Sequence, residues 1–162
     1  MPATLNAPYA VRSGTMLGEV LAAIHEEWIA NAERAIAPAL LGTSTIWDRW
    51  SAVRYLMDAF AEQLEQEREL VRRLPRIDPE ARDRIERGFE TMERLRAELD
   101  LAGRRHHTGG LVMLLLRKLM DVFTHWCATI ERAAARVPLA SLPADVVERL
   151  DRLDGSPARL GA

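Results

Sequence analysis

Apolar residues recur every three or four positions along most of this chain, in long stretches separated by short segments rich in glycine, proline, serine or threonine. This spacing is typical of amphipathic helices, which place one apolar stripe toward a core. No stretch alternates β-branched and polar residues as a half-buried strand does, and alanine, leucine, glutamate and arginine dominate the composition. The pattern therefore predicts an all-α protein.

Capping and breaking residues set the boundaries of the predicted helices. Four long helices and a short fifth are predicted over residues 14–39, 45–74, 79–103, 109–137 and 143–153. The predicted N-caps are Ser44 or Thr45, Asp78 and Thr108, with Pro79 at a first helical position. Four amphipathic helices joined by short loops pack best as an antiparallel up-down four-helix bundle, here with a short fifth C-terminal helix. We expect one domain over residues 13–154, with flexible tails at residues 1–12 and 155–162.

Length and composition narrow the function. The chain has 162 residues and 48% hydrophobic content, enough for the core of one domain. Its 22 basic and 24 acidic residues give a net charge of −2, so we expect no nucleic acid and no membrane as partner. The N-terminal segment MPATLNAPYAVRSG lacks the basic start and apolar core of a signal peptide, and the longest apolar run, residues 111–116, is too short for a membrane span. We therefore expect a soluble cytoplasmic protein.

Metal and catalytic chemistry find little support in the residue pattern. A di-iron carboxylate site in a bundle uses the motif Glu-x-x-His, which none of the four histidines completes. Asp121 precedes His125 by four residues, but the pair falls on the polar face of its helix. The single cysteine, Cys127, excludes an intrachain disulfide and lies on an apolar stripe, where we expect a buried thiol. We therefore predict no catalytic residues, no metal ligands and no cofactor, and we favour a protein that is not an enzyme.

Two segments resemble a known family of helical bundles. The segment QLEQERELVRRLP and the segment from LLRKLMDVFTHW to VERLDRL are similar to the second and fourth helices of the hemerythrin-like (HHE) family. The resemblance implies a four-helix bundle with a di-iron centre that serves oxygen binding, iron handling or sensing, so iron is the alternative cofactor. At the corresponding positions, Glu67 matches a carboxylate ligand, whereas Gln63 stands where a histidine is expected, and Ala128 and Arg132 occupy the ligand positions on the fourth helix. The alternative function is therefore a metal-binding or small-ligand-binding bundle.

A candidate buried polar site comprises Glu67, Gln63 and His25. Glu67 replaces an apolar residue in its stripe, and folding the chain about its turns places it level with Gly88 and Ala128. Such small residues leave room for water or a small ligand. Alternatively, Glu67 points outward and pairs with an arginine, Arg84 or Arg68. His25 lies at the edge of its stripe, where a hydrogen-bonded core histidine is the common case.

A second candidate lies in the segment LAGRRHHTGGL between the third and fourth helices. The predicted bundle places this segment at the same end as the N-termini of the second and fourth helices, whose free N–H groups suit anions. Its candidate anion-binding residues are Arg104, Arg105, His106, His107 and Thr108. We interpret the segment as a helix-ending turn, in which basic residues complement the helix dipole, with a phosphate or carboxylate cradle as the alternative.

The remaining sequence features indicate association with another protein. Trp47 and Tyr55 lie off the apolar stripe of the second helix and form a candidate partner surface. The fourth helix is apolar over more than half of its circumference, so it is either central or covered by a partner. We therefore predict a non-catalytic, regulatory or sensory binding module that acts through a protein partner or as a homodimer.

Overall fold

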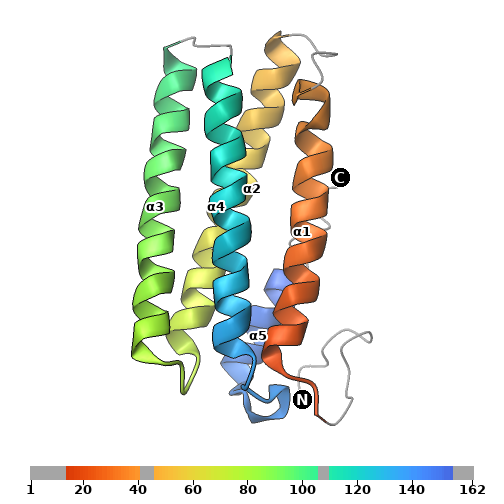
Figure 1. The fold of residues 1–162 in the computed structure, drawn as a ribbon. Helices are drawn as coiled ribbons and strands as arrows, with labels where there is room; N and C mark the ends of the chain where they lie inside the picture. Colours follow the sequence, from red (N-terminus) through yellow and green to blue (C-terminus); the bar gives the residue numbers. More distant parts are fainter. Residues whose placement is uncertain (1–13, 41–45, 106–109, 155–162) are drawn as a thin grey trace.

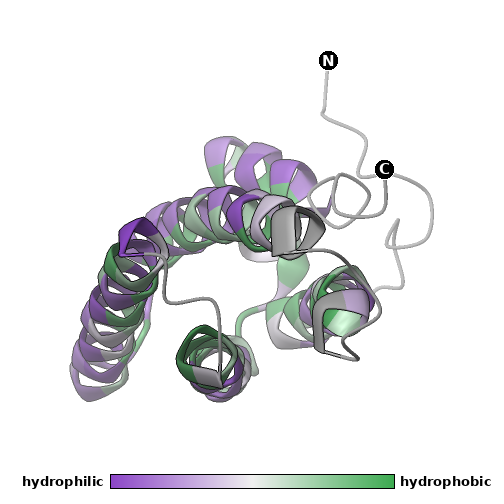
Figure 2. Cartoon of the chain, turned by 90° about the horizontal axis from the view of Figure 1, so that it is seen from above, coloured by the Kyte–Doolittle hydropathy of each residue, from purple (hydrophilic) through white to green (hydrophobic). Residues whose placement is uncertain are grey.

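The computed structural model describes residues 14–40, 46–105 and 110–154 of the chain. These residues form the helices α1 (Leu17–Leu40), α2 (Ile46–Arg73), α3 (Pro79–Arg104), α4 (Gly110–Ala134), the 3₁₀ turn η1 (Leu139–Ser141) and α5 (Ala144–Asp154). Successive long helices run in opposite directions (Figure 1), and in the view down the bundle their hydrophobic sides turn toward one another (Figure 2). The predicted all-α bundle with a short fifth helix is confirmed. The predicted tails, at residues 1–12 and 155–162, fall outside the described residues. So does residue 13, the first residue of the predicted domain.

The predicted helix boundaries hold at α3 and fail at the end of α4. The Asp78 carboxylate accepts a hydrogen bond from the backbone N–H of Ala81 at 3.1 Å, which is the predicted N-cap. Helix α4 ends at Ala134 rather than at the predicted Val137. Pro138 disfavours a helical conformation of Val137, and beyond the helix the Val137 carbonyl accepts a hydrogen bond from the N–H of Leu17 at 2.8 Å. The segment after α4 thus pairs with the start of α1 instead of extending the helix.

This pairing joins the start of α1 to the segment after α4 at one end of the bundle. Met16 and Pro138 form an isolated antiparallel bridge, and the N–H of Leu139 donates to the carbonyl of Thr15 at 3.0 Å. The helices approach closely just beyond it, because a Cβ built on Gly18 of α1 would lie 2.6 Å from the carbonyl oxygen of Glu131 in α4. Only glycine permits this distance, so α1 and α4 pack backbone to backbone at this point.

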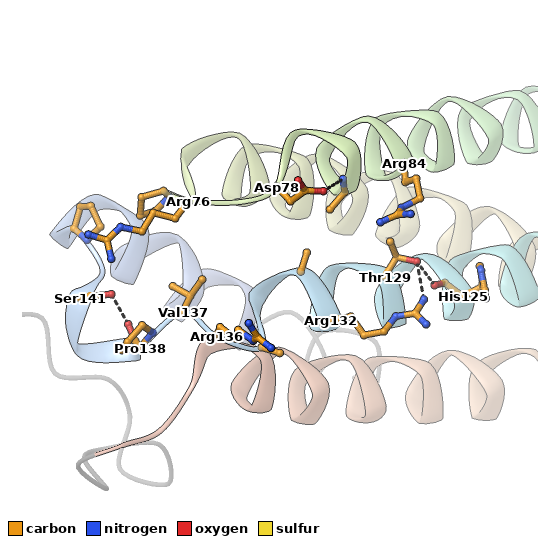
Figure 3. Close-up of a pocket in the computed structure, with 15 residues that line it drawn as sticks. Arg76, Asp78, Arg84, His125, Thr129, Arg132, Arg136, Val137, Pro138 and Ser141 are labelled. Atoms are coloured by element: carbon orange, nitrogen blue, oxygen red, sulfur yellow. Dashed lines mark hydrogen bonds between the residues drawn. The ribbon is translucent and has the colours of Figure 1, made fainter.

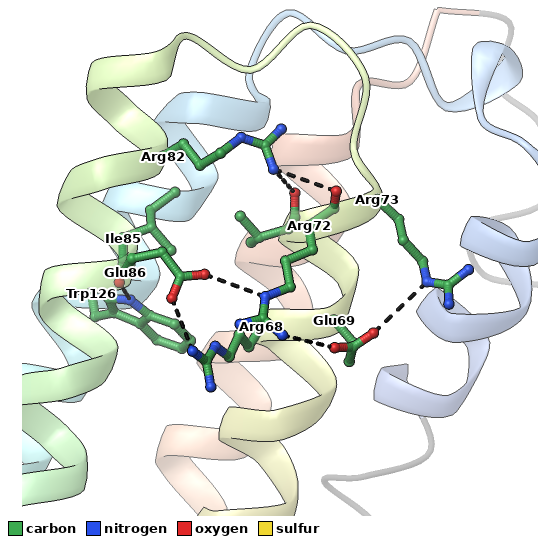
Figure 4. A network of polar contacts seen from close by, with 9 residues as sticks. Arg68, Glu69, Arg72, Arg73, Arg82, Ile85, Glu86 and Trp126 are labelled. Atoms are coloured by element: carbon green, nitrogen blue, oxygen red, sulfur yellow. Dashed lines mark hydrogen bonds and ion pairs between the residues drawn. The ribbon is translucent and has the colours of Figure 1, made fainter.

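Polar contacts fix the turn between α2 and α3 (Figure 4). The Arg82 guanidinium donates to the carbonyls of Val71 and Leu74, both at 3.2 Å, and so satisfies acceptors that the end of α2 leaves free. Arg68 of α2 pairs with Glu86 of α3 at 3.3 Å. On the other side of α2, Arg73 pairs with Asp145 of α5 at 2.9 Å. These contacts hold α3 and α5 on opposite flanks of α2.

The core is built around three aromatic rings from three different helices. The Trp28 ring of α1 lies 4.7 Å from the Phe123 ring of α4, and Phe60 of α2 lies 4.9 Å from Phe123, measured between ring centroids. Tilted and edge-on contacts of this kind add to the free energy of burial. Trp126 continues the cluster toward α3, where its Nε1 donates to the carbonyl of Ile85 at 2.8 Å.

No helix in the described part of the chain is long and apolar enough to span a bilayer.

Candidate functional site

A histidine held between two carboxylates lies inside the bundle. The Nε2 atom of His25 lies 2.8 Å from Oε1 of Glu67, and its Nδ1 atom lies 2.7 Å from Oε1 of Glu131. Gln63 Nε2 donates to the same Glu67 oxygen at 2.9 Å. His25, Gln63 and Glu67 are fully buried, whereas the Glu131 side chain is 28% exposed. The structure thus brings together the three residues of the predicted polar site and adds a fourth.

Helical spacing presents these groups to one another. Gln63 and Glu67 are four residues apart on α2, and Cys127 and Glu131 are four apart on α4, so each pair shares one helix face. His25 comes from α1, which lies beside both helices (Figure 1). One imidazole therefore links three helices through its two ring nitrogens.

The surroundings of His25 favour the charged imidazolium. Burial of the ring lowers its pKa, but the negative charge of Glu67 raises it. Hydrogen bonds with Cys127, Glu131 and Glu67 add to the rise, so the pKa of His25 reaches about 12, far above the ordinary 6.5. The neighbouring thiol favours its neutral form, because burial raises the pKa of Cys127 to about 11. At neutral pH the cluster therefore contains an imidazolium between carboxylates and a neutral thiol.

This arrangement does not fit a metal centre. A histidine binds a metal ion through the lone pair of a ring nitrogen, and both ring nitrogens of His25 face carboxylate oxygens instead. At the other ligand positions that the family resemblance implies, Gln63 offers an amide, Ala128 no donor, and Arg132 an exposed cation. In the part of the chain that the structure describes, no three histidine, cysteine or acidic side chains are placed to hold a metal ion.

Glu67 turns inward, which decides between the two orientations that the sequence left open. The arginines that offered an outward pairing are engaged elsewhere, Arg68 with Glu86 at 3.3 Å and Arg84 with Glu80 at 3.2 Å. The expected space beside Gly88 is not there, because a Cβ on this glycine would lie 2.5 Å from Cδ1 of Trp126. Glycine at this position accommodates the indole ring.

Glu131 was missed by the sequence reasoning. It lies at the edge of the α4 stripe and carries the charge expected of a solvated residue. Its position four residues after the buried Cys127 was the available signal, because that spacing places it on the flank facing α1. Gly18 allows α1 and α4 to approach closely beside Glu131, whose carboxylate reaches His25.

The predicted anion segment is described only in part. Arg104 and Arg105 are exposed at the end of α3, and Arg104 pairs with Asp100 at 3.0 Å. Residues 106–109, and with them His106, His107 and Thr108, fall outside the described residues. The ends of α1 and α3 and the starts of α2 and α4 do lie at one end of the bundle, as predicted (Figure 1). Of the predicted partner surface, Tyr55 is 47% exposed, and the Trp47 side chain is outside the described set.

A cleft that the sequence did not indicate opens at the other end of the bundle (Figure 3). It lies between the start of α3, the end of α4 and the segment that leads to α5. Its charged and titratable lining residues are Arg76, Asp78, Arg84, His125, Arg132 and Arg136. The arginines come from elements distant in sequence, which is why periodicity alone did not group them.

The fold and these sites define an all-α bundle with a buried charged cluster and no metal-binding side-chain set among the described residues. Comparison of the chain with family models, with curated proteins and with solved structures gives no match. The function is therefore argued from the geometry.

Proposed function

We propose that this protein is a non-catalytic binding module that works as a homodimer, with α4 as the contact helix. The observation that carries the proposal is the exposure of two leucines at the start of α4. Leu111 is 49% exposed and Leu114 is 64% exposed, the largest value among the exposed large hydrophobic side chains of the described residues. Exposed apolar residues grouped on one helix face are typical of protein–protein contacts.

The two leucines belong to a continuous outward face. Leu111, Leu114, Lys118 and Asp121 follow the spacing i, i+3, i+7 and i+10, which places all four on one side of a helix. All four side chains are exposed, and we call this set the α4 outer face. The opposite side of α4 is buried in the core. The first turns of α4, which carry Leu111 and Leu114, are therefore apolar on both sides.

The charges on the α4 outer face favour a second copy of this chain as the partner. Lys118 and Asp121 carry opposite charges one turn apart, and neither forms an ion pair within the described residues. In a twofold symmetric contact, residue i of one copy meets residue j of the other, and the reverse also holds. Two antiparallel α4 helices would thus pair Lys118 with Asp121 twice, and the leucines of each copy would lie against the later part of α4 in the other copy.

Replacing the leucines by charged residues tests the proposal. Burying half of a leucine side chain contributes about 1 kcal/mol, so the four leucines of a dimer contribute about 4 kcal/mol, or roughly 1,000-fold in Kd. Sedimentation velocity over micromolar to submillimolar concentrations should show a concentration-dependent dimer that Leu111→Lys/Leu114→Lys abolishes. Tyr55→Lys is the matched control, because Tyr55 is similarly exposed on α2, diagonally across the bundle. A monomer at every concentration, or dissociation caused by the Tyr55 variant alone, would overturn the proposal.

Exchanging the charges tests the symmetry. Lys118→Asp and Asp121→Lys should each weaken the dimer, because like charges then face one another across the axis. An equimolar mixture of the two variants should restore association, since both contacts of the mixed dimer pair opposite charges again. Failure of the mixture to associate more strongly than either variant would contradict the twofold arrangement.

A further inference from the structure

The cleft at the opposite end of the bundle from the start of α4 points to a second binding site. We propose that it binds a small organic phosphate that carries at least two negative charges. The cleft measures about 1090 Å³ and lies between α3, α4 and the segment leading to α5. Sites for small ligands typically measure about 300–1,000 Å³, so the cleft is large enough for an organic body as well as its charged groups.

The lining carries a strong local positive charge in a chain whose net charge is −2. Four arginines line the cleft against a single carboxylate, Asp78. That carboxylate is already engaged as the N-cap of α3, where it accepts the N–H of Ala81. The concave surface therefore offers cationic hydrogen-bond donors with little negative charge beside them, and such a cleft concentrates anions.

Among the described residues, three of the four cleft arginines form no ion pair that would compete with a ligand. In the described part of the chain, no ion pair involves Arg76, Arg132 or Arg136, and Arg132 has only a 3.5 Å hydrogen bond with the hydroxyl of Thr129. Arg84 pairs with Glu80, but both side chains are more than half exposed, and such a pair exchanges readily for a stronger partner. Figure 3 shows Arg84 on α3 opposite the α4 surface that carries Thr129 and Arg132.

Guanidinium groups select the chemistry of the ligand. The planar fork of arginine binds phosphate oxygens in pairs, and it loses less hydration than an ammonium group would. Several such groups, from α3, α4 and the segments that flank them, suit a ligand with more than one negative charge. A single carboxylate would leave most of them unused.

The remaining lining suits an organic body. Apart from Thr129 and Ser141, it is formed by alanine, valine and proline side chains, namely Ala81, Ala133, Ala135, Val137, Pro75, Pro138 and Pro143. Ala81 and Val137 are buried, so they form the floor. Three features hold this floor: the cap of α3, the bridge between Met16 and Pro138, and the hydrogen bond from the Ser141 hydroxyl to the Pro138 carbonyl at 2.7 Å. The site is therefore largely preformed, which lowers the entropic cost of binding.

The test uses inorganic pyrophosphate as the probe and the full chain as the protein. Isothermal titration calorimetry at constant ionic strength should detect binding to the wild type. Arg132→Gln/Arg136→Gln should weaken it at least tenfold, because the variant removes two unpaired donors. Arg54→Gln/Arg117→Gln is the matched control, since it removes the same charge from exposed positions outside the cleft. It should change the Kd by less than about twofold, allowing for long-range screening. Circular dichroism checks that both variants keep the helical fold.

Three results of the pyrophosphate titrations would overturn the proposal. They are the absence of pyrophosphate binding to the wild type, an equal loss in the control variant, and an unchanged Kd in the cleft variant. A single-stranded oligonucleotide is included as a competitor. If it binds more tightly than pyrophosphate and depends on Arg132 and Arg136, the site serves a nucleic acid and not a small phosphate.

Discussion

Replacement of His25 should remove a large part of the protein's free energy of unfolding. In His25→Leu, the Glu67 carboxylate would stay buried with the amide of Gln63 as its remaining hydrogen-bond donor. Its second oxygen, Oε2, has no donor among the described residues even with the histidine present. Breaking a buried ion pair from one side typically costs about 3–5 kcal/mol, against a total of about 5–15 kcal/mol for an ordinary domain.

Removing both partners should be milder. In His25→Leu/Glu67→Leu, no buried charge is left alone and the added side chains are apolar, so we expect most of the lost stability to return. Urea denaturation followed by tryptophan fluorescence measures the free energy of unfolding of each variant, and the double variant should be at least 2 kcal/mol more stable than His25→Leu. A double variant as unstable as the single one would show that the cluster acts through packing and not through charge.

The pH dependence supplies an independent check. The pKa of His25 is raised from 6.5 in the unfolded chain to about 12 in the folded protein. The pair's contribution is therefore complete below pH 6.5 and declines as pH rises toward the folded-state value, at about 1.4 kcal/mol per pH unit for one proton. The free energy of unfolding of the wild type, minus that of the double variant, should fall by about 3 kcal/mol between about pH 6.5 and pH 9. A difference that stays constant over this range would refute an imidazolium in the core.

Two further predictions concern the packing of α4. Gly88→Ala should destabilise the protein by about 1–3 kcal/mol in thermal denaturation, because the new Cβ would overlap the Trp126 indole. Gly110→Ala, where a Cβ would meet nothing within 4 Å, should leave the melting temperature unchanged or raise it. Cys127 should not react with a thiol reagent such as DTNB at pH 8 in the folded protein, because it is 1% exposed and its pKa is raised to about 11. It should react at once in denaturant, and fast reaction of the folded protein would contradict its burial.

The helices and much of the polar cluster follow from the sequence because local rules govern them. Asp78 and Pro79 form a cap within four residues, and the apolar stripes alone assign the buried faces of α1 to α4. The inward turn of Glu67 did not follow, because an arginine at the surface and a histidine in the core are both plausible partners. The choice depends on the rotation of α1 relative to α2, which periodicity does not define.

The end of α4 and the cleft were beyond sequence reasoning for a related reason. Apolar spacing continues through Val137, but the helix ends at Ala134 and the segment after it pairs with the start of α1. The cleft arginines are spread over the turn before α3, α3 itself and the end of α4, and only the folded chain groups them. Contacts between elements distant in sequence therefore decided each feature that the pattern missed.

The bridge between Met16 and Pro138 also bears on the order of folding. Neighbouring helices in sequence can pair after closing short loops, whereas this bridge joins positions about 120 residues apart, for which loop closure costs roughly 4 kcal/mol of chain entropy. On a ribosome, α1 cannot complete its contacts until α4 and the segment after it have emerged. The α1–α2, α2–α3 and α3–α4 hairpins can then form first, with the contact between α1 and α4 closing last. Substitutions at Gly18, where α1 meets α4, should accordingly speed unfolding more than they slow folding.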